Sequence, residues 1–329
     1  MDLAATLKLA AFAVTIEACL GYPQGLFRAI GHPVTWTGRL IALADGRLNH
    51  DDRSFATRRA LGFAALFLLL SIAGGGGYLF SLGLAGLELP QPVSLALTAL
   101  IASSLIAQRS LDTHVLAVAE ALAAGVAVGR AAAAKIVGRE VAKLDEAGVA
   151  RAAIESLAEN FSDAVVAPAF WLALGGLPGG ACYKAINTAD SMVGHRTQRH
   201  AAFGFAAAKL DDIVNFCPAR LSACLVVIAA WFAPKASARA AWCTIRRDAR
   251  GHPSPNAGWP EAAFAGALGL RLGGPRVYGE VKIDDAWIGS GKEPSGHDIR
   301  RALRLYRFAC GVHWTVLALL AAIMWNLII

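Results

Sequence analysis

Charged residues recur at four-residue spacing between positions 151 and 163. The stripe consists of Arg151, Glu155, Glu159 and Asp163, with Asn160 beside them. In a helix these residues lie one above another on a single face, so three carboxylates stand in line. One interpretation is a solvated stripe held by a weak ion pair between Arg151 and Glu155. Because the stripe leads into an apolar segment that begins at Ala164, and acids entering a membrane segment are functional candidates, we favour a functional site.

Two further groups of acids and amides follow the stripe. The first contains Lys184, Asn187, Asp190 and Ser191, and the second contains Lys209, Asp211, Asp212 and Asn215. In a helix Asp211 and Asp212 both reach Asn215, which places two carboxylates and an amide within one turn. Mg²⁺ takes hard oxygen ligands, usually one or two carboxylates together with substrate phosphate and water. Helix capping is the alternative role for these residues. We predict a magnesium site at Asp211, Asp212 and Asn215.

Several cations are candidates for binding an anion. Arg139, Arg196, Arg199 and Arg220 could each hold a phosphate or carboxylate through two parallel hydrogen bonds, or could anchor the edge of a membrane. Among the eight histidines, His32 and His252 are the best candidates, because each precedes a proline in an expected loop. The six cysteines form no CxxC pair, which indicates neither a zinc site nor a disulfide framework. A phosphate-binding P-loop signature is also missing.

The elements that must position these residues belong to a membrane protein. Apolar residues make up 56% of the 329 residues and charged residues 17%, with a mean hydropathy of +0.49. The runs 61–87, 89–108 and 308–329 are each long enough to cross a hydrocarbon core, which needs roughly 20 apolar residues in a helix. We therefore predict an all-α fold, a polytopic bundle of transmembrane helices with polar helical segments.

Two other segments are less regular. The stretch 3–20 carries Lys8 and Glu17, which argues against an ordinary span and suggests a first helix with a functional acid. The stretch 164–183 is uncharged but interrupted by glycines and prolines, so we expect a broken or re-entrant helix there. The polar segment before it, from 130 to 163, should form a pair of helices that breaks near Asp145 to Gly148.

The organisation follows from these elements. We expect a single membrane domain over 1–329, with a polar catalytic segment at 130–220 and a cytoplasmic loop region at 235–307. Arginines crowd the loop before residue 61 and lysine and arginine the region after 234, and both should face the cytoplasm. The net charge of +7 lies beside apolar spans without any nucleic-acid motif. Membrane lipids and anionic substrates are thus the expected partners, and nucleic acid is not.

A set of short motifs resembles the adenosylcobinamide-phosphate synthase family of cobalamin biosynthesis. The motifs are GHPV at 31–34, IVGR at 136–139, AIESLAEN at 153–160, YKAINTADSMVG at 183–194, LDD at 210–212, PAR at 218–220 and SPNAG at 254–258. They extend over nearly the whole chain, and together they are highly specific.

The resemblance implies an enzyme of the bacterial plasma (inner) membrane whose active face is cytoplasmic. It would join adenosylcobyric acid, a corrinoid, to (R)-1-amino-2-propanol or its O-phosphate, with Mg²⁺ and with ATP as co-substrate. Other late corrinoid-pathway enzymes would be further partners. The catalytic residues would be Glu155, Glu159, Asn160, Asp163, Lys184, Asn187 and Asp190, and the metal ligands Asp211, Asp212 and Asn215. The substrate would be bound by His32, Arg139, Ser191, Arg196, Arg220 and Asn256.

Two other classes of protein remain as alternatives. Broken helices and acids at the membrane edge also suit a transporter. A non-catalytic membrane scaffold is the third class. Transporters usually show two related halves, which this sequence lacks, and a scaffold has no need of three groups of acids and amides. An enzyme is therefore the favoured reading.

Overall fold

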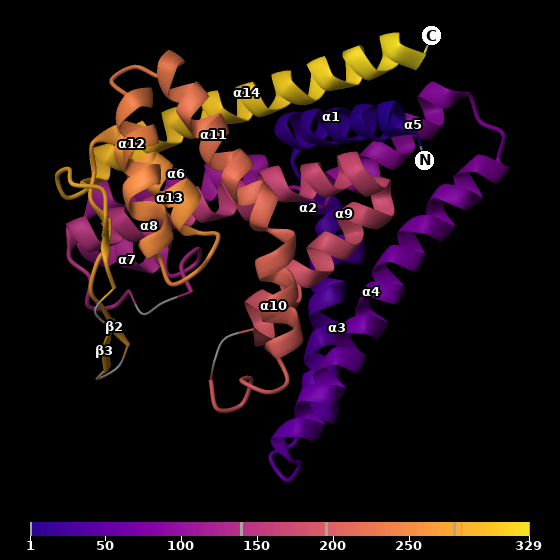
Figure 1. The fold of residues 1–329 in the computed structure, drawn as a ribbon, viewed down its shortest axis with the longest axis horizontal. Coiled ribbons are helices and arrows are strands. Elements are labelled where there is room, and N and C mark those ends of the chain that lie inside the picture. The colour runs from indigo at the N-terminus through magenta and orange to yellow at the C-terminus, as the bar shows by residue number, and fades with distance from the viewer. Residues whose placement is uncertain (1, 139–140, 195–196, 279–280, 284, 329) are drawn as a thin grey trace. The chain divides into compact units, whose positions relative to one another are not determined.

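The computed structural model describes residues 2–138, 141–194, 197–278, 281–283 and 285–328. Within them the chain is helical almost throughout, as expected for an all-α fold (Figure 1). The helices are α1 (Leu3–Leu20), α2 (Gln24–Ile30), α3 (Pro33–Leu48), α4 (Phe55–Gly86), α5 (Gln91–Ser103), α6 (Gln108–Ala124), α7 (Val126–Ala133), α8 (Glu146–Asn160), the π-helix η1 (Phe161–Val166), α9 (Ala167–Val193), α10 (Phe205–Val214), α11 (Phe216–Phe232), α12 (Ala238–Asp248), the 3₁₀-helix η2 (Ala249–Gly251), α13 (Gly258–Leu268) and α14 (Gly296–Ile328). Four short strands, β1 (Leu272–Gly273), β2 (Arg276–Tyr278), β3 (Val281–Ile283) and β4 (Trp287–Ile288), pair antiparallel as β1 with β4 and β2 with β3.

Five helical stretches in the described residues are long and apolar enough to cross a membrane, and α10 with α11 would make a sixth if the pair is one span. The five are Leu3–Leu20, Phe55–Gly86, Gln91–Ala124, Glu146–Val193 and Gly296–Asn326. Three of them overlap the three predicted runs. The first stretch meets these criteria although Lys8 and Glu17 argue against it. The Lys8 ammonium stands 3.2 Å from the centre of the Trp325 ring, and Glu17 is buried, so the fold accommodates both charges.

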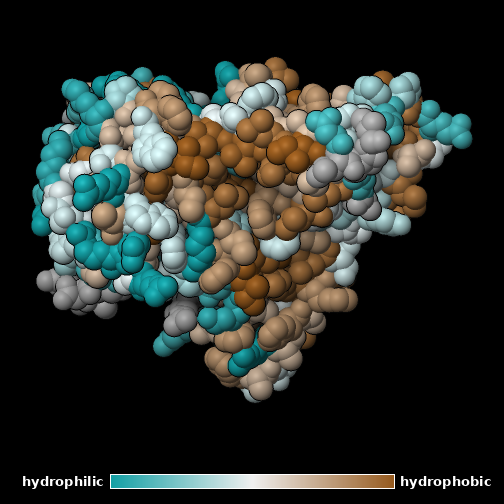
Figure 2. Space-filling model, turned by 45° about the horizontal axis from the view of Figure 1, so that its top comes forward, coloured by the Kyte–Doolittle hydropathy of each residue, from teal (hydrophilic) through white to brown (hydrophobic). Residues whose placement is uncertain are grey.

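The contacts divide the chain into two compact units. The first unit contains Met1–Ala107, Ala167–Asn215 and Leu317–Ile329, and therefore α1 to α5, α9, α10 and the end of α14. Its core includes Ile41 of α3, Leu66 and Leu69 of α4, Ala189 of α9 and Phe203. The outward side chains of α4 are mainly apolar, among them Phe63, Phe67 and Ile72, and wide apolar areas are visible in Figure 2. Such a surface suits a lipid environment.

The second unit contains Gln108–Val166 and Phe216–Val316. Its core is built on buried aromatic residues, with the ring of Phe161 packed edge-on against Tyr306 at 5.6 Å between centres. The Tyr306 hydroxyl donates to the Gln108 carbonyl at 2.8 Å, so α14 is fixed to the start of α6. The expected loop region 235–307 lies here, and it contains α12, α13, the four strands and the beginning of α14. Its position on the cytoplasmic side stays a prediction, as does the single-domain organisation.

The predicted broken helix is α9. Its helical geometry is interrupted at Gly176, where φ is 59° and ψ is −155°, and Pro178 follows within the same element. A positive φ of this kind is accessible to glycine at little cost, and proline removes a helical hydrogen bond. The break is therefore encoded by these two residues. Whether the helix also re-enters the membrane stays a prediction.

The predicted pair of polar helices is shorter than expected. α7 ends at Ala133, and α8 begins only at Glu146, where the Asp145 carboxylate caps it by accepting from the Gly148 amide at 2.8 Å. The described part of the segment between them lies against α8, because the Ser156 hydroxyl donates to the Ile136 carbonyl at 2.8 Å. The first predicted helix is thus wrong beyond Ala133, because the described residues that follow form turns, such as the bond from the Ile136 amide to the Ala133 carbonyl. The predicted break near Asp145 agrees with the start of α8.

Candidate functional site

Acids and amides of α9 and α10 meet inside the first unit. Asn215, which caps the end of α10 and is 1% exposed, forms hydrogen bonds with residues of both helices. Its amide nitrogen donates to Asp211 Oδ2 at 2.9 Å, and its amide oxygen accepts from the Tyr183 hydroxyl at 2.9 Å. Asn187 reaches the other oxygen of Asp211 at 3.5 Å. We call Tyr183, Asn187, Asp190, Asp211 and Asn215 the acid–amide cluster.

The spacing of these residues explains why they meet. Tyr183, Asn187 and Asp190 stand four and three residues apart, which is one face of α9, and Asp211 precedes Asn215 by four residues on α10. Asp190 lies near enough to Asp211 for the two negative charges to repel each other. In a partly buried place such repulsion is stronger than in water and calls for a compensating positive charge.

Lys184 and His32 are a second pair in the same unit. His32 caps α3: its Nδ1 accepts from the Val34 amide at 3.2 Å, and the Tyr22 ring packs edge-on against the imidazole at 4.3 Å. Burial, and next the positive charge of Lys184, lower the pKa of His32 below its usual value. The imidazole is consequently neutral at neutral pH, and it lies within the electrostatic reach of Lys184 on α9.

Two other predicted residues of the first unit have different surroundings. Asp212 points about 100° away from Asp211 around the helix and pairs instead with Lys209, three residues earlier, at 3.1 Å. The Ser191 hydroxyl is exposed and donates to the carbonyl of Asn187. Within the described residues no three side chains of His, Cys, Asp or Glu are grouped to hold a metal. The oxygens of Asp190 and Asp211 nevertheless fit the few carboxylates through which Mg²⁺ is usually held.

The acidic stripe lies in the second unit, and its members are not equivalent. Glu155 is buried, and its Oε1 accepts from the Gly273 amide at 2.7 Å, so it holds β1 against α8. Arg151 stands 5.1 Å from the centre of the Trp287 ring in β4. Asn160 donates to the Ser156 carbonyl at 2.9 Å. Glu159, by contrast, is exposed and leaves a carboxylate at the surface of the unit.

The regular spacing of the stripe ends where α8 becomes the π-helix η1. Asp163 lies in η1, where hydrogen bonds close over five residues instead of four, so it is no longer aligned as in an α-helix. The pattern of one acid in every four residues therefore holds only as far as α8. Single π-helical turns within longer helices are frequent at functional sites.

Two predicted binding residues meet in the second unit. Arg220 Nη1 donates to Asn256 Oδ1 at 2.9 Å, which joins α11 to the loop before α13. Arg139 and Arg196 lie outside the described residues.

The sequence analysis missed three residues of these sites. One is Tyr183, although its four-residue spacing from Asn187 is a signal. The others are Arg250 and Trp259, which line the same pocket as Arg220.

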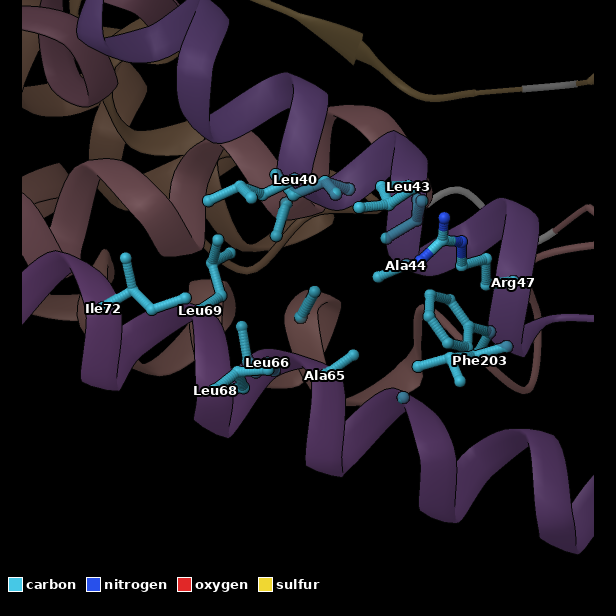
Figure 3. Close-up of a pocket in the computed structure, with 16 residues that line it drawn as sticks. Leu40, Leu43, Ala44, Arg47, Ala65, Leu66, Leu68, Leu69, Ile72 and Phe203 are labelled. Carbon is cyan, nitrogen blue, oxygen red and sulfur yellow. The ribbon is translucent and has the colours of Figure 1, made fainter.

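An apolar pocket of about 250 Å³ also lies in the first unit, between α3 and α4 (Figure 3). Leu40 and Leu43 of α3 face Leu66 and Leu69 of α4, and Arg47 also lines the pocket. In the part of the chain that the structure describes, no carboxylate or side-chain amide lines this pocket, so its described lining lacks the groups that the predicted chemistry needs.

Comparison with known proteins agrees with the resemblance seen in the motifs. Residues 10–306 match the model of the family described as CobD/Cbib protein. The chain is 44% identical over 317 residues to the cobalamin biosynthesis protein CobD of Rhodobacter capsulatus, which covers 95% of this chain and 96% of the relative. It is 45% identical over 310 residues to the protein of the same name from a Sinorhizobium species, over 93% of this chain and 95% of the relative.

A third relative, cobalamin biosynthesis protein CobD of Brucella anthropi, is 43% identical over 328 residues, which is 97% of this chain and 95% of the relative. No solved structure matches the chain. Identity at this level over nearly full length, together with the family match, leads to one conclusion. The chain belongs to the CobD/CbiB family of cobalamin biosynthesis proteins.

Proposed function

We propose that this protein is an ATP-dependent acid–amine ligase that joins adenosylcobyric acid to (R)-1-amino-2-propanol or its O-phosphate. The observation that carries the proposal is the acid–amide cluster, in which two carboxylates stand close together among amides and a tyrosine hydroxyl. The membership in a family of cobalamin biosynthesis proteins supports the corrinoid as the substrate class.

The chemistry of the reaction suits this set of residues. A carboxylate does not react with an amine at neutral pH until it is activated, for example as an acyl phosphate, and the amine must lose a proton to a base. Mg²⁺, when bound, would neutralise the charge that builds up on the transferring phosphate. Asp190 and Asp211 would hold it, since a divalent cation attracts both carboxylates and so offsets the repulsion between them.

The other residues take supporting roles. Asn187 and Asn215 hydrogen-bond to Asp211 and hold its carboxylate in one orientation, and Tyr183 in turn fixes Asn215. Glu159 is the better candidate for the base, because its side chain is exposed, whereas Glu155 is buried against β1. Arg220 with Asn256 would bind a phosphate, and Arg139 and Arg196 keep the same expected role.

The test is the reaction itself. Purified protein in detergent is supplied with adenosylcobyric acid, aminopropanol O-phosphate and Mg·ATP, and the mixture is analysed by mass spectrometry. We expect the amide product, with one ATP consumed per amide, and no product when Mg²⁺ or ATP is left out. A protein that binds the corrinoid but forms no amide under these conditions would disprove the proposal.

A further inference from the structure

A second pocket, of about 420 Å³, lies within the second unit. It is formed by the start of α11, by η2 and by the loop that leads into α13. Phe216, Arg220, Arg250, Ser254 and Trp259 supply its side chains. Among the described residues that line it there are two arginines and no carboxylate. The described lining of this pocket is therefore positively charged, whereas the acid–amide cluster is negatively charged.

Arg220 is held in a fixed position in this pocket. Its Nη1 donates to the Phe216 carbonyl at 2.8 Å and to Asn256 Oδ1 at 2.9 Å, and its Nη2 donates to the Pro255 carbonyl at 3.3 Å. The guanidinium also lies over the Phe216 ring at 3.6 Å and the Trp259 ring at 4.5 Å. A guanidinium has five N–H groups, so the bonds to described residues leave donors for a ligand. A planar group fixed in this way is preorganised to bind an anion.

Arg250 brings a second positive charge close to the first. It lies in η2, is exposed, and is near enough to Arg220 for their charges to repel. The acid nearest to it in sequence, Asp248, is engaged, since it accepts from Arg247 at 2.6 Å and from the Gly289 amide at 2.7 Å. Two cations that face one pocket without a lining acid create a positive potential, which an anion would relieve.

The loop that completes the pocket is also preorganised. The Ser254 hydroxyl oxygen accepts from the Ala257 amide at 3.2 Å, and the Ser254 amide donates to His252 Nδ1 at 3.0 Å. A Cβ atom on Gly258 would lie 2.3 Å from the Ala249 carbonyl oxygen, so only glycine lets the loop close on η2. The hydroxyl hydrogen of Ser254 remains to donate into the pocket.

We propose that this pocket binds the phosphate group of a small phosphate ester, between Arg220 and Arg250, with the rest of the molecule against Trp259. A phosphate ester pairs with the fork of a guanidinium through two of its oxygens, and its double charge and third oxygen suit a site with two arginines. The identity of the ester as amino alcohol phosphate or nucleotide rests on the proposed function. The existence of the phosphate site rests on the pocket alone.

Calorimetric titration of the full chain in phosphatidylcholine nanodiscs tests the proposal. The probes are O-phosphoethanolamine as a small amino alcohol phosphate, Mg·ATP, and ethanolamine as the phosphate-free counterpart. We expect at least one of the phosphate esters to bind, ethanolamine not to bind, and Arg250→Gln to weaken binding about tenfold or more. Arg220→Lys should weaken it as well, because lysine cannot replace the planar fork.

Arg246→Gln is the matched control, since Arg246 is an exposed arginine of α12 that does not line the pocket. This variant should bind as the wild type does. Absence of binding by both esters, or equal loss in Arg246→Gln and Arg250→Gln, would overturn the proposal. The proposal would also be overturned if Arg250→Gln differed from the wild type only in nanodiscs that contain phosphatidylglycerol, because the ligand of Arg250 would then be a lipid headgroup.

The titration contains no corrinoid, so its outcome is separate from that of the ligase assay. Amide formation without phosphate binding here would reject this inference and leave the proposed function intact. Phosphate binding that depends on Arg250, in a protein that forms no amide, would support this inference and reject the proposed function. Thermal unfolding of each variant shows that a loss of binding is not a loss of fold.

Discussion

At the scale of residues, Glu155 and Glu159 stand one turn apart on α8 and have opposite environments. Glu155 is 6% exposed and accepts from the Gly273 amide, whereas Glu159 is exposed. We predict that Glu155→Ala destabilises the fold by about 1 to 3 kcal/mol, because it leaves a buried N–H without an acceptor. Glu159→Gln should leave the unfolding temperature unchanged and slow amide formation. Thermal unfolding and initial rates, measured on both variants, check this; full activity in Glu159→Gln would reject it as the base.

His32 gives the fold a dependence on pH. Burial and then the charge of Lys184 lower its pKa in the folded protein below the ordinary 6.5. As the pH falls through 6.5 the unfolded chain takes up a proton that the folded chain does not, so protonation favours unfolding. The stability linked to His32 is complete above that pH and decreases as the pH falls towards the lowered pKa of the folded state.

The measurement is the unfolding temperature at about pH 7.5 and about pH 5.5. His32→Asn keeps a residue that can cap α3 but removes the titration. We predict that the wild type loses more thermal stability between these two pH values than His32→Asn does. Equal losses in the two proteins would contradict the assignment of the lowered pKa to His32.

At the scale of elements, the packing of α4 depends on glycine at one position and not at another. A Cβ atom on Gly62 would lie 2.0 Å from the Phe203 carbonyl oxygen, whereas one on Gly75 would meet nothing within 4 Å. Gly62→Ala should therefore destabilise the protein by about 1 to 3 kcal/mol. Gly75→Ala in the same helix should be neutral or stabilising by up to about 1 kcal/mol. Thermal unfolding in one detergent compares them, and equal effects would show that α4 does not pack closely at Gly62.

The elements were predictable to different degrees. The apolar run 61–87 lies in α4 up to Gly86, and the described part of the run 308–329 lies in α14, because uncharged length alone identifies a candidate span. The actual start of α4 at Phe55 was not evident, since Arg58 and Arg59 look like a loop until their partners are known. Arg58 donates to Asn49 at 2.6 Å, and Arg59 lies over the Phe205 ring. The contact of Arg58 spans the turn between α3 and α4, and that of Arg59 joins residues far apart in the sequence. Neither contact is evident from the sequence.

The candidate site was likewise predictable only in part. The pairing of Asp211 with Asn215 follows from their four-residue spacing. The bonds from Asn187 to Asp211 and from Tyr183 to Asn215 join two helices, and such contacts have no signature in a single sequence. The π-helix η1 was also not predictable, because no residue type marks it. The magnesium site predicted at Asp211, Asp212 and Asn215 stays a prediction, and the pairing of Asp212 with Lys209 is why we propose Asp190 beside Asp211.

At the scale of the whole molecule, the distribution of charge predicts how the chain lies in the membrane. The loop between α3 and α4 is flanked by arginines and should face the cytoplasm. The turn between α4 and α5 has no lysine or arginine and should face outward. In a variant whose six cysteines are replaced by serine, we predict that an impermeant maleimide labels Gln91→Cys in intact cells. Asp52→Cys should be labelled only after permeabilisation, and the reverse pattern would invert the proposed orientation.

The central claim is that the acid–amide cluster is where the amide is made, and the activity of Asp211→Asn tests it most directly. We predict that this variant forms product about 100-fold more slowly than the wild type or not at all. Its unfolding temperature should be retained or raised, because the repulsion between Asp190 and Asp211 is lost. Asp52→Asn, at an exposed turn of the same unit, should keep the full rate. Amide formation by Asp211→Asn at the rate of the wild type would contradict the account.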